Sequence, residues 1–271
     1  GEVGGGSRPV NPFFFGSSKS PLYGVYHPPK SAVGPATAVL LCYPMGAEYM
    51  RAHRAFRQLT TLLVKGGAHV LRFDYFGTGD SAGDATEATF ARWREDIGTA
   101  IEELKEMCQA ERVTVIGLRF GATLAAQAVA GRTDVEHLVL WDPIIDGPAY
   151  VREMLATHVA EQSARGRGAG SGTAGVHGFP LLKEQRDEIN AITLQSWPAA
   201  SARRVDVVRS SAAADAEALA SKLASAGCSA SYAVFPSNGN WAESDAFGSA
   251  LIPQGIIQGI IGKVLESGVT A

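Results

Sequence analysis

The sequence has little of what would mark a secreted, membrane-spanning or nucleic-acid-binding protein. Its 271 residues include three cysteines, whose spacing indicates neither a disulfide framework nor a metal site. No apolar run approaches the ~20 residues that are needed to cross a bilayer. There is no long basic run and the formal net charge is −3, so nothing favours binding to nucleic acid or to an anionic membrane. We expect a cytoplasmic protein without a metal or cofactor.

The apolar segments that are present alternate between strand-like and helix-like patterns. Short apolar runs such as 37–42 and 69–74 are separated by amphipathic stretches such as 50–65 and 87–109. This alternation predicts an α/β protein with a mainly parallel sheet and helices on both faces. Further strands are expected at 12–15, 22–26, 113–116, 137–142, 205–208 and 231–235, and further helices at 150–162, 181–192, 214–226 and 253–265.

The regular alternation is interrupted once, between residues 144 and 200. This stretch holds two helical patterns separated by the glycine-rich run R-G-R-G-A-G-S-G-T-A-G at 165–175, which is typical of a flexible connector. An insertion at this point would cover the C-terminal edge of the sheet as a cap. We therefore expect a flexible leader at 1–9 and a single domain at 10–268, with a cap insertion at 144–200.

One motif raises the question of function. In V-T-V-I-G-L-R-F-G-A, residues 113–122, an apolar strand is followed by two glycines and the start of an alanine-rich helix. This is the shape of a nucleophile elbow, the strand–turn–helix of G-x-S-x-G that exposes a serine in a strained turn. Here the central residue is Arg119, and a guanidinium cannot attack a carbonyl.

Three other motifs join the elbow in resembling a known family. They are L-L-C-Y-P-M-G-A-E at 40–48, F-D-Y-F-G-T-G-D-S-A-G-D at 73–84 and F-P-S-N-G-N-W at 235–241. Together they resemble the α/β-hydrolase superfamily, in its serine-aminopeptidase-like and monoacylglycerol-lipase-like branch. The G-L-R-x-G-A elbow is most similar to that of exosortase A system-associated hydrolases. The resemblance implies an α/β-hydrolase fold with a cap, and an oxyanion loop within 40–48.

The catalytic triad of that family is incomplete in this chain. Hydrolysis by this fold needs Ser, then Asp or Glu, then His in chain order. Arg119 takes the serine position, Asn240 takes the histidine position, and no histidine follows His177. Only the acid has candidates, Asp142 and Asp215. We therefore expect no serine-triad esterase activity.

Arginine at an elbow needs an acceptor, because its permanent charge and five donors are costly to bury alone. It could pair with Glu48 from the oxyanion loop, or with Asp142 or Asp146 after the adjacent strand. It could instead bind a substrate anion or a developing oxyanion. A salt bridge that closes an inactive pocket is the competing structural interpretation.

The candidate catalytic residues are accordingly Arg119, Glu48 and Asp142, with no metal ligands. Aromatic side chains at strand ends predict an apolar pocket for a small molecule. The candidate substrate-binding residues are Tyr43, Met45, Phe120, Trp141, His177, Asn240 and Trp241. The expected partner is a small-molecule substrate, with acyl and thioester-linked compounds among the options, and a homodimer is left open.

Three functional hypotheses follow. The first is an enzyme of serine-independent acid–base chemistry, such as elimination or cyclisation, acting on a small carbonyl, carboxylate or acyl substrate in biosynthesis. The second is a non-catalytic, degenerate hydrolase that binds a ligand or partner. The third is a hydrolase with an unconventional nucleophile such as Cys42, whose competing interpretation is a small buried hydrophobe.

Overall fold

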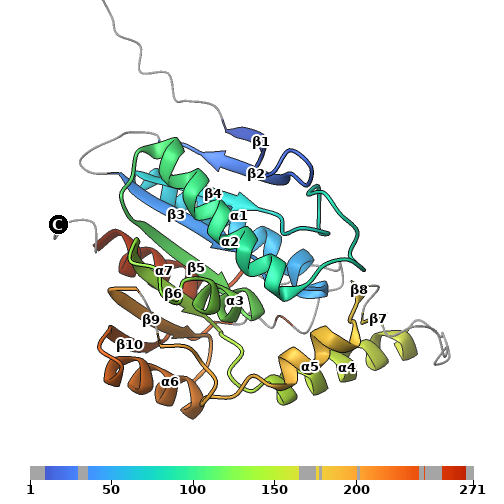
Figure 1. Cartoon of the computed structure of the whole chain (residues 1–271). Coiled ribbons are helices and arrows are strands. Elements are labelled where there is room, and N and C mark those ends of the chain that lie inside the picture. The colour runs from blue at the N-terminus through green and yellow to red at the C-terminus, as the bar shows by residue number, and fades with distance from the viewer. Residues whose placement is uncertain are drawn as a thin grey trace, which may run out of the picture.

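A mainly parallel eight-stranded sheet forms the centre of the molecule in the computed structural model (Figure 1). The structure describes residues 10–29, 36–164, 175–176, 179–199, 202–237, 241 and 252–266. The strands of this sheet are β1 (Asn11–Phe15), β2 (Leu22–His27), β3 (Thr37–Cys42), β4 (Ala68–Phe73), β5 (Val113–Leu118), β6 (Val135–Trp141), β9 (Arg204–Arg209) and β10 (Ser229–Val234).

The strand order is β1-β2-β4-β3-β5-β6-β9-β10. Strand β2 pairs antiparallel with both β1 and β4. The remaining strands, in the order β4, β3, β5, β6, β9 and β10, are parallel to one another. The central strands are mostly apolar, as expected for strands covered by helices on both faces, and every residue of β5 is buried. The burial of β2 alternates along its length, as expected for a strand near the sheet edge that is covered on one face.

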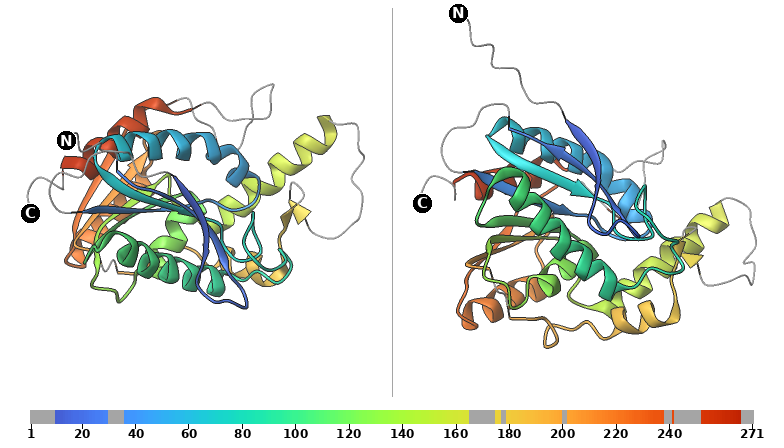
Figure 2. Two further views of the ribbon diagram at one scale, coloured as in Figure 1. Left: turned by 90° about the horizontal axis from the view of Figure 1, so that it is seen from above. Right: turned by 45° about the horizontal axis from the view of Figure 1, so that its top comes forward.

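Helices cover the two faces of the sheet (Figure 2). On one face α1 (Ala47–Lys65) contacts α7 (Gln254–Glu266), and on the other α2 (Phe90–Cys108) contacts α3 (Phe120–Ala128). Helix α6 (Ala214–Ser225) packs on β9 and β10. These positions confirm the α/β fold class and the helices expected from apolar periodicity.

Between β6 and β9 the chain forms the elements of the predicted cap. They are α4 (Gly147–Ala164), a short hairpin of β7 (Gly175–Val176) and β8 (Phe179–Pro180), and α5 (Lys183–Asn190). The sequence predicts both helices but not the hairpin, because strands of two residues are too short to show an alternation of apolar and polar residues. Figure 1 shows α4 and α5 beyond the end of the sheet at which β6 ends. The predicted leader at 1–9 lies outside the described residues, and so does the predicted connector at 165–175 except for Gly175, which begins β7. The domain limits 10–268 and 144–200 stay a prediction.

None of the helices in the described segments is long and apolar enough to cross a membrane.

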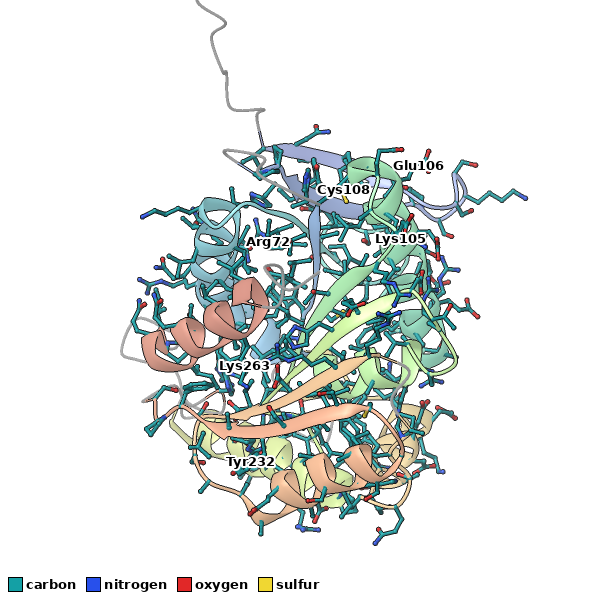
Figure 3. All side chains as sticks on the ribbon, turned by 90° about the vertical axis from the view of Figure 1, so that its left-hand side faces the viewer. Arg72, Lys105, Glu106, Cys108, Tyr232 and Lys263 are labelled. Atoms are coloured by element: carbon teal, nitrogen blue, oxygen red, sulfur yellow. The ribbon has the colours of Figure 1, made fainter. Side chains whose placement is uncertain are left out.

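A buried carboxylate links the last strands to α7. Asp206 on β9 is fully buried and accepts from His137 Nε2 on β6 at 2.7 Å and from Lys263 Nζ on α7 at 2.9 Å. Arg204 forms an ion pair with it at 2.7 Å, and Ser231 also donates to it. Burial alone would raise the pKa of Asp206, but these donors hold it well below its usual value. His137 and Asp206 lie in the N-terminal halves of β6 and β9, and Lys263 of this network is labelled in Figure 3.

Candidate functional site

The elbow is formed as the motif predicts. Arg119 lies between β5 and α3 with φ 54° and ψ −123°, a conformation that is strained for a residue with a side chain. Two glycines allow the turn to close. A Cβ on Gly121 would come within 2.2 Å of the Tyr43 carbonyl oxygen, and one on Gly117 within 2.5 Å of the Ala122 Cα. Helix α3 can therefore start close against the end of β3.

Arg119 is held by two carboxylates. Its Nε donates to Glu48 Oε1 at 2.9 Å, and its Nη2 contacts both carboxylate oxygens of Glu153 at 2.9 Å. Tyr150 donates its hydroxyl to Glu48 Oε2 at 2.8 Å, and its ring centroid lies 5.2 Å from the Arg119 Cζ. These four side chains, called here the elbow cluster, join α1, the elbow and the first turns of α4.

The two carboxylates of the elbow cluster differ in burial. The side chain of Glu48 is 9% exposed and that of Arg119 is 12% exposed, whereas that of Glu153 is 42% exposed. Burial raises the pKa of Glu48, and Arg119 and Tyr150 oppose that rise. Burial by itself disfavours the Arg119 cation, but Glu48, Tyr150 and Glu153 raise its pKa above its usual value. Arg119 is thus a fixed cation with one inner and one outer counter-ion.

Of the predicted partners of Arg119, the structure brings only Glu48 to it. Asp142 accepts instead from the Ser210 backbone N–H at 2.9 Å and from Trp241 Nε1 at 3.2 Å. Asp146 is exposed and accepts from the Ala149 N–H at 2.8 Å, at the start of α4. The grouping of Asp142 with Arg119 as catalytic partners is therefore corrected. The other acid candidate, Asp215, is exposed in the first turn of α6.

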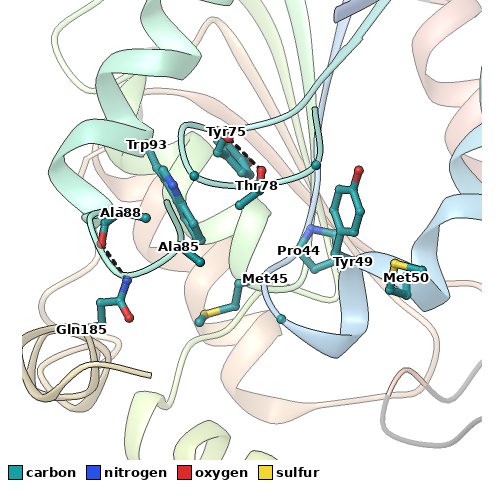
Figure 4. A pocket seen from close by; sticks show the side chains of 13 residues that line it. Pro44, Met45, Tyr49, Met50, Tyr75, Thr78, Ala85, Ala88, Trp93 and Gln185 are labelled. Atoms are coloured by element: carbon teal, nitrogen blue, oxygen red, sulfur yellow. Dashed lines mark hydrogen bonds between the residues drawn. The ribbon is translucent and has the colours of Figure 1, made fainter. Parts of the chain in front are cut away.

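A cavity of about 230 Å³ opens beside the loop between β3 and α1 (Figure 4). None of its lining residues carries a charge, and the polar side chains on its wall already have partners. Gln185 Nε2 donates to the Ala88 carbonyl at 2.9 Å, and Tyr49 donates to Asp74 at 2.7 Å. The lining residues are Pro44, Met45, Gly46, Tyr49, Met50, Tyr75, Gly77, Thr78, Gly79, Ala85, Ala88, Trp93 and Gln185.

Among the predicted substrate-binding residues that the structure describes, Met45 alone lines this cavity. The predicted aromatic residues Tyr43, Phe120, Trp141 and Trp241 are buried in packing contacts instead. Phe120 packs on Phe90 with ring centroids 4.6 Å apart, and the rings of Trp141 and Trp241 lie 5.5 Å apart. The other two predicted residues, His177 and Asn240, lie outside the described residues.

Cys42 is fully buried at the end of β3, and burial raises the pKa of its thiol. A reactive cysteine needs a thiolate and access, so this environment does not favour Cys42 as a nucleophile. Ser81 is engaged in the local turn, since it donates to the Asp74 carbonyl at 2.6 Å and accepts from the Tyr23 N–H at 2.8 Å.

Sequence reasoning missed Glu153 and Tyr150 in the elbow cluster, and Trp93 and Gln185 in the cavity wall. A usable signal existed for the first pair, because residues three apart on a helix share a face. No local pattern marks Trp93 or Gln185, which come from helices far apart in the chain and meet only in the fold.

Comparison with known proteins places the chain in a family. A sequence model of the serine aminopeptidase S33 family matches residues 35–201, while no curated protein sequence matches the chain. An esterase of Pyrococcus furiosus shares 14% identity over 96% of this chain and 91% of its own, with a TM-score of 0.62.

Two further solved structures are similar in fold. A proline iminopeptidase-related protein from Thermus thermophilus shares 17% identity over 96% of this chain and all of its own, with a TM-score of 0.64. Est1E from Butyrivibrio proteoclasticus, solved with ferulic acid bound, shares 14% identity over 95% and 98% of the two chains, with a TM-score of 0.63. With the family match covering more than half of the sequence, the chain belongs to the serine aminopeptidase S33 family and has the α/β-hydrolase fold.

Proposed function

We propose that this protein binds a small, largely apolar ligand and does not hydrolyse esters at its elbow. The observation that carries the proposal is the state of Arg119, whose guanidinium is bound by Glu48 and Glu153 where a hydrolase presents a free hydroxyl. The sequence favours an enzyme over a binding protein. Engagement of Arg119 by two carboxylates supports the binding protein instead, because its Nε and Nη2 donate to protein side chains.

The cavity supports the binding half of the proposal. Ligand sites are concave and mostly apolar, with few polar groups. The wall beside Met45 and Trp93 has this character, and its side-chain donors are taken up within the protein. An apolar ligand of modest size would therefore be favoured by burial alone.

Two measurements test this proposal. Turnover of p-nitrophenyl butyrate should not exceed that of a heat-treated control, and a fluorophosphonate probe should label no serine. Octanamide, a neutral apolar probe, should bind to the protein. Binding should weaken in Ala85→Trp, which fills the cavity rim, and stay unchanged in Glu106→Trp, an exposed position on α2. Ester turnover with stoichiometric serine labelling would refute the proposal. It would also be refuted if octanamide bound to Ala85→Trp with the same affinity as to the wild type.

Acid–base catalysis is the second candidate, favoured by the raised pKa of Glu48 beside Arg119 and Tyr150. A positioned carboxyl group can give or take a proton as a general acid or base. This candidate predicts that a substrate found by incubating the protein with acyl thioesters is consumed by the wild type and not by Glu48→Gln. Consumption at equal rates by both would exclude Glu48 as the acid–base group.

A further inference from the structure

The outer side of the Arg119 guanidinium is occupied by a carboxylate that solvent can reach. Glu153 places both of its oxygens 2.9 Å from Arg119 Nη2, and its side chain is 42% exposed. The inner carboxylate of Glu48 has no such freedom, because it is buried and bonded to both Arg119 and Tyr150. Of the two counter-ions, only Glu153 can leave into water without exposing the interior.

The elbow cluster and the cavity are neighbours in the structure. The loop and first turn of α1 supply Met45, Gly46 and Tyr49 to the cavity wall and Glu48 to the elbow cluster.

A continuous row of aromatic rings makes a second connection. Tyr150 of the elbow cluster stacks on Phe120 at 6.2 Å, and Phe120 contacts Phe90 at 4.6 Å. Phe90 then contacts Trp93 of the cavity wall at 5.4 Å. These rings are buried, with Phe90 1% and both Phe120 and Tyr150 2% exposed, so the row is packed core that fixes the position of the elbow cluster relative to the cavity wall.

We propose that Glu153 holds the place of a ligand's carboxylate, and that the site takes an anionic amphiphile. Its apolar part would lie in the cavity, and its carboxylate would displace Glu153 from Arg119. This inference rests on the proposed ligand-binding function and specifies the class of ligand. Exchange of one carboxylate for another leaves the charge of the elbow cluster unchanged, and the planar fork of arginine suits either.

The Glu153 carboxylate competes with a ligand's carboxylate for Arg119. Removal of the Glu153 charge should therefore strengthen the binding of anionic ligands and leave that of neutral ligands unchanged. The experiment compares octanoate with octanamide, which match in chain length and differ in charge, by calorimetric titration at pH 7.5. The proteins are the wild type, Glu153→Gln and Glu184→Gln, the last being an exposed glutamate on α5 of the cap. We expect octanoate to bind about tenfold more tightly to Glu153→Gln than to the wild type, the scale of one charge-assisted hydrogen bond. Octanamide affinity should be unchanged, and Glu184→Gln should change neither.

A double variant identifies the cation. In Glu153→Gln/Arg119→Lys the gain for octanoate should fall, because a point charge does not reproduce the arginine fork. Thermal melting of each variant confirms that the fold is intact.

The outcomes separate the two proposals. If octanamide binds and octanoate gains nothing from Glu153→Gln, the displacement inference is overturned and the apolar binding site stands. An equal gain for both probes also overturns it, because the effect is then not one of charge. If neither probe binds to any variant, the ligand-binding function itself fails, and this inference fails with it.

Discussion

Arg119 occupies the strained turn between β5 and α3, and its environment explains how an arginine is tolerated there. The turn is strained for any residue with a side chain, and Arg119 holds it with φ 54°. The charge is accepted because Glu48 lies 2.9 Å away and is itself held by Tyr150. A buried ion pair stabilises a fold little compared with apolar residues of similar size, but loss of one member leaves an uncompensated charge.

A double-mutant cycle at neutral pH tests this pairing. Arg119→Met should lower the free energy of unfolding by ~3–5 kcal/mol, because Glu48 then remains buried without its cation. Arg119→Met/Glu48→Gln should recover much of that loss, since the second change removes the buried charge. Urea denaturation measures both. Losses that add, with no recovery, would show that the two side chains are not coupled.

At the scale of elements, the contact between α3 and β3 fixes the position of the elbow. Gly121 is in the first turn of α3, and a Cβ there would meet the carbonyl oxygens of Tyr43 at 2.2 Å and of Cys42 at 2.5 Å. Both obstacles are backbone atoms, which cannot rotate away as a side chain can. The helix lies this close to the strand only because the residue is glycine.

Gly121→Ala should therefore lower the free energy of unfolding by ~1–3 kcal/mol, the usual effect of overpacking a core. Gly98→Ala is the matched control, since Gly98 lies inside α2 and the nearest atom to its added Cβ is Arg132 Nη1 at 3.8 Å. That substitution should raise stability by up to ~1 kcal/mol through helix propensity. Equal effects of the two substitutions would contradict the close packing of α3 on β3.

At the scale of the whole molecule, two networks of charged side chains link strands and helices away from the uncharged cavity wall. The Asp206 network ties β6, β9, β10 and α7 together, and Arg72 on β4 binds His27 on β2 at 3.1 Å. Burial first, and the Arg72 charge second, lower the pKa of His27 to about 4 from its ordinary 6.5. The folded state thus holds His27 neutral where the unfolded chain would protonate it.

Acid should for this reason begin to weaken the fold as the pH falls below 6.5. As the pH falls from 6.5 toward 4, the unfolded chain gains a proton at His27 that the folded chain does not. The free energy of unfolding should therefore fall by at most ~1.4 kcal/mol per pH unit. Above pH 6.5 both states are neutral there and the contribution is constant. In His27→Gln the free energy of unfolding should decline less steeply between pH 6.5 and 4, with equal slopes near pH 8. Identical slopes across the whole range would contradict the assignment.

Several features of this protein could be predicted from the sequence because they depend on neighbouring residues. The apolar runs at 37–42 and 113–116, the amphipathic helices and the glycines around Arg119 determine strands, helices and the elbow turn locally. The sequence predicts Glu48 as one of several possible partners of Arg119, because both residues lie in motifs at the ends of neighbouring strands.

Only the tertiary structure decided which of those options is realised and what surrounds it. Glu153 and Tyr150 reach Arg119 because α4 crosses over the end of the sheet, and Asp142 does not because Ser210 and Trp241 hold it. The cavity wall combines residues from 44–50, 75–93 and α5, which no local pattern connects. The physical reason is that the periodicity of apolar residues indicates which face of a strand or helix is buried. The partner of a buried charge depends instead on how elements that are distant in the chain pack together.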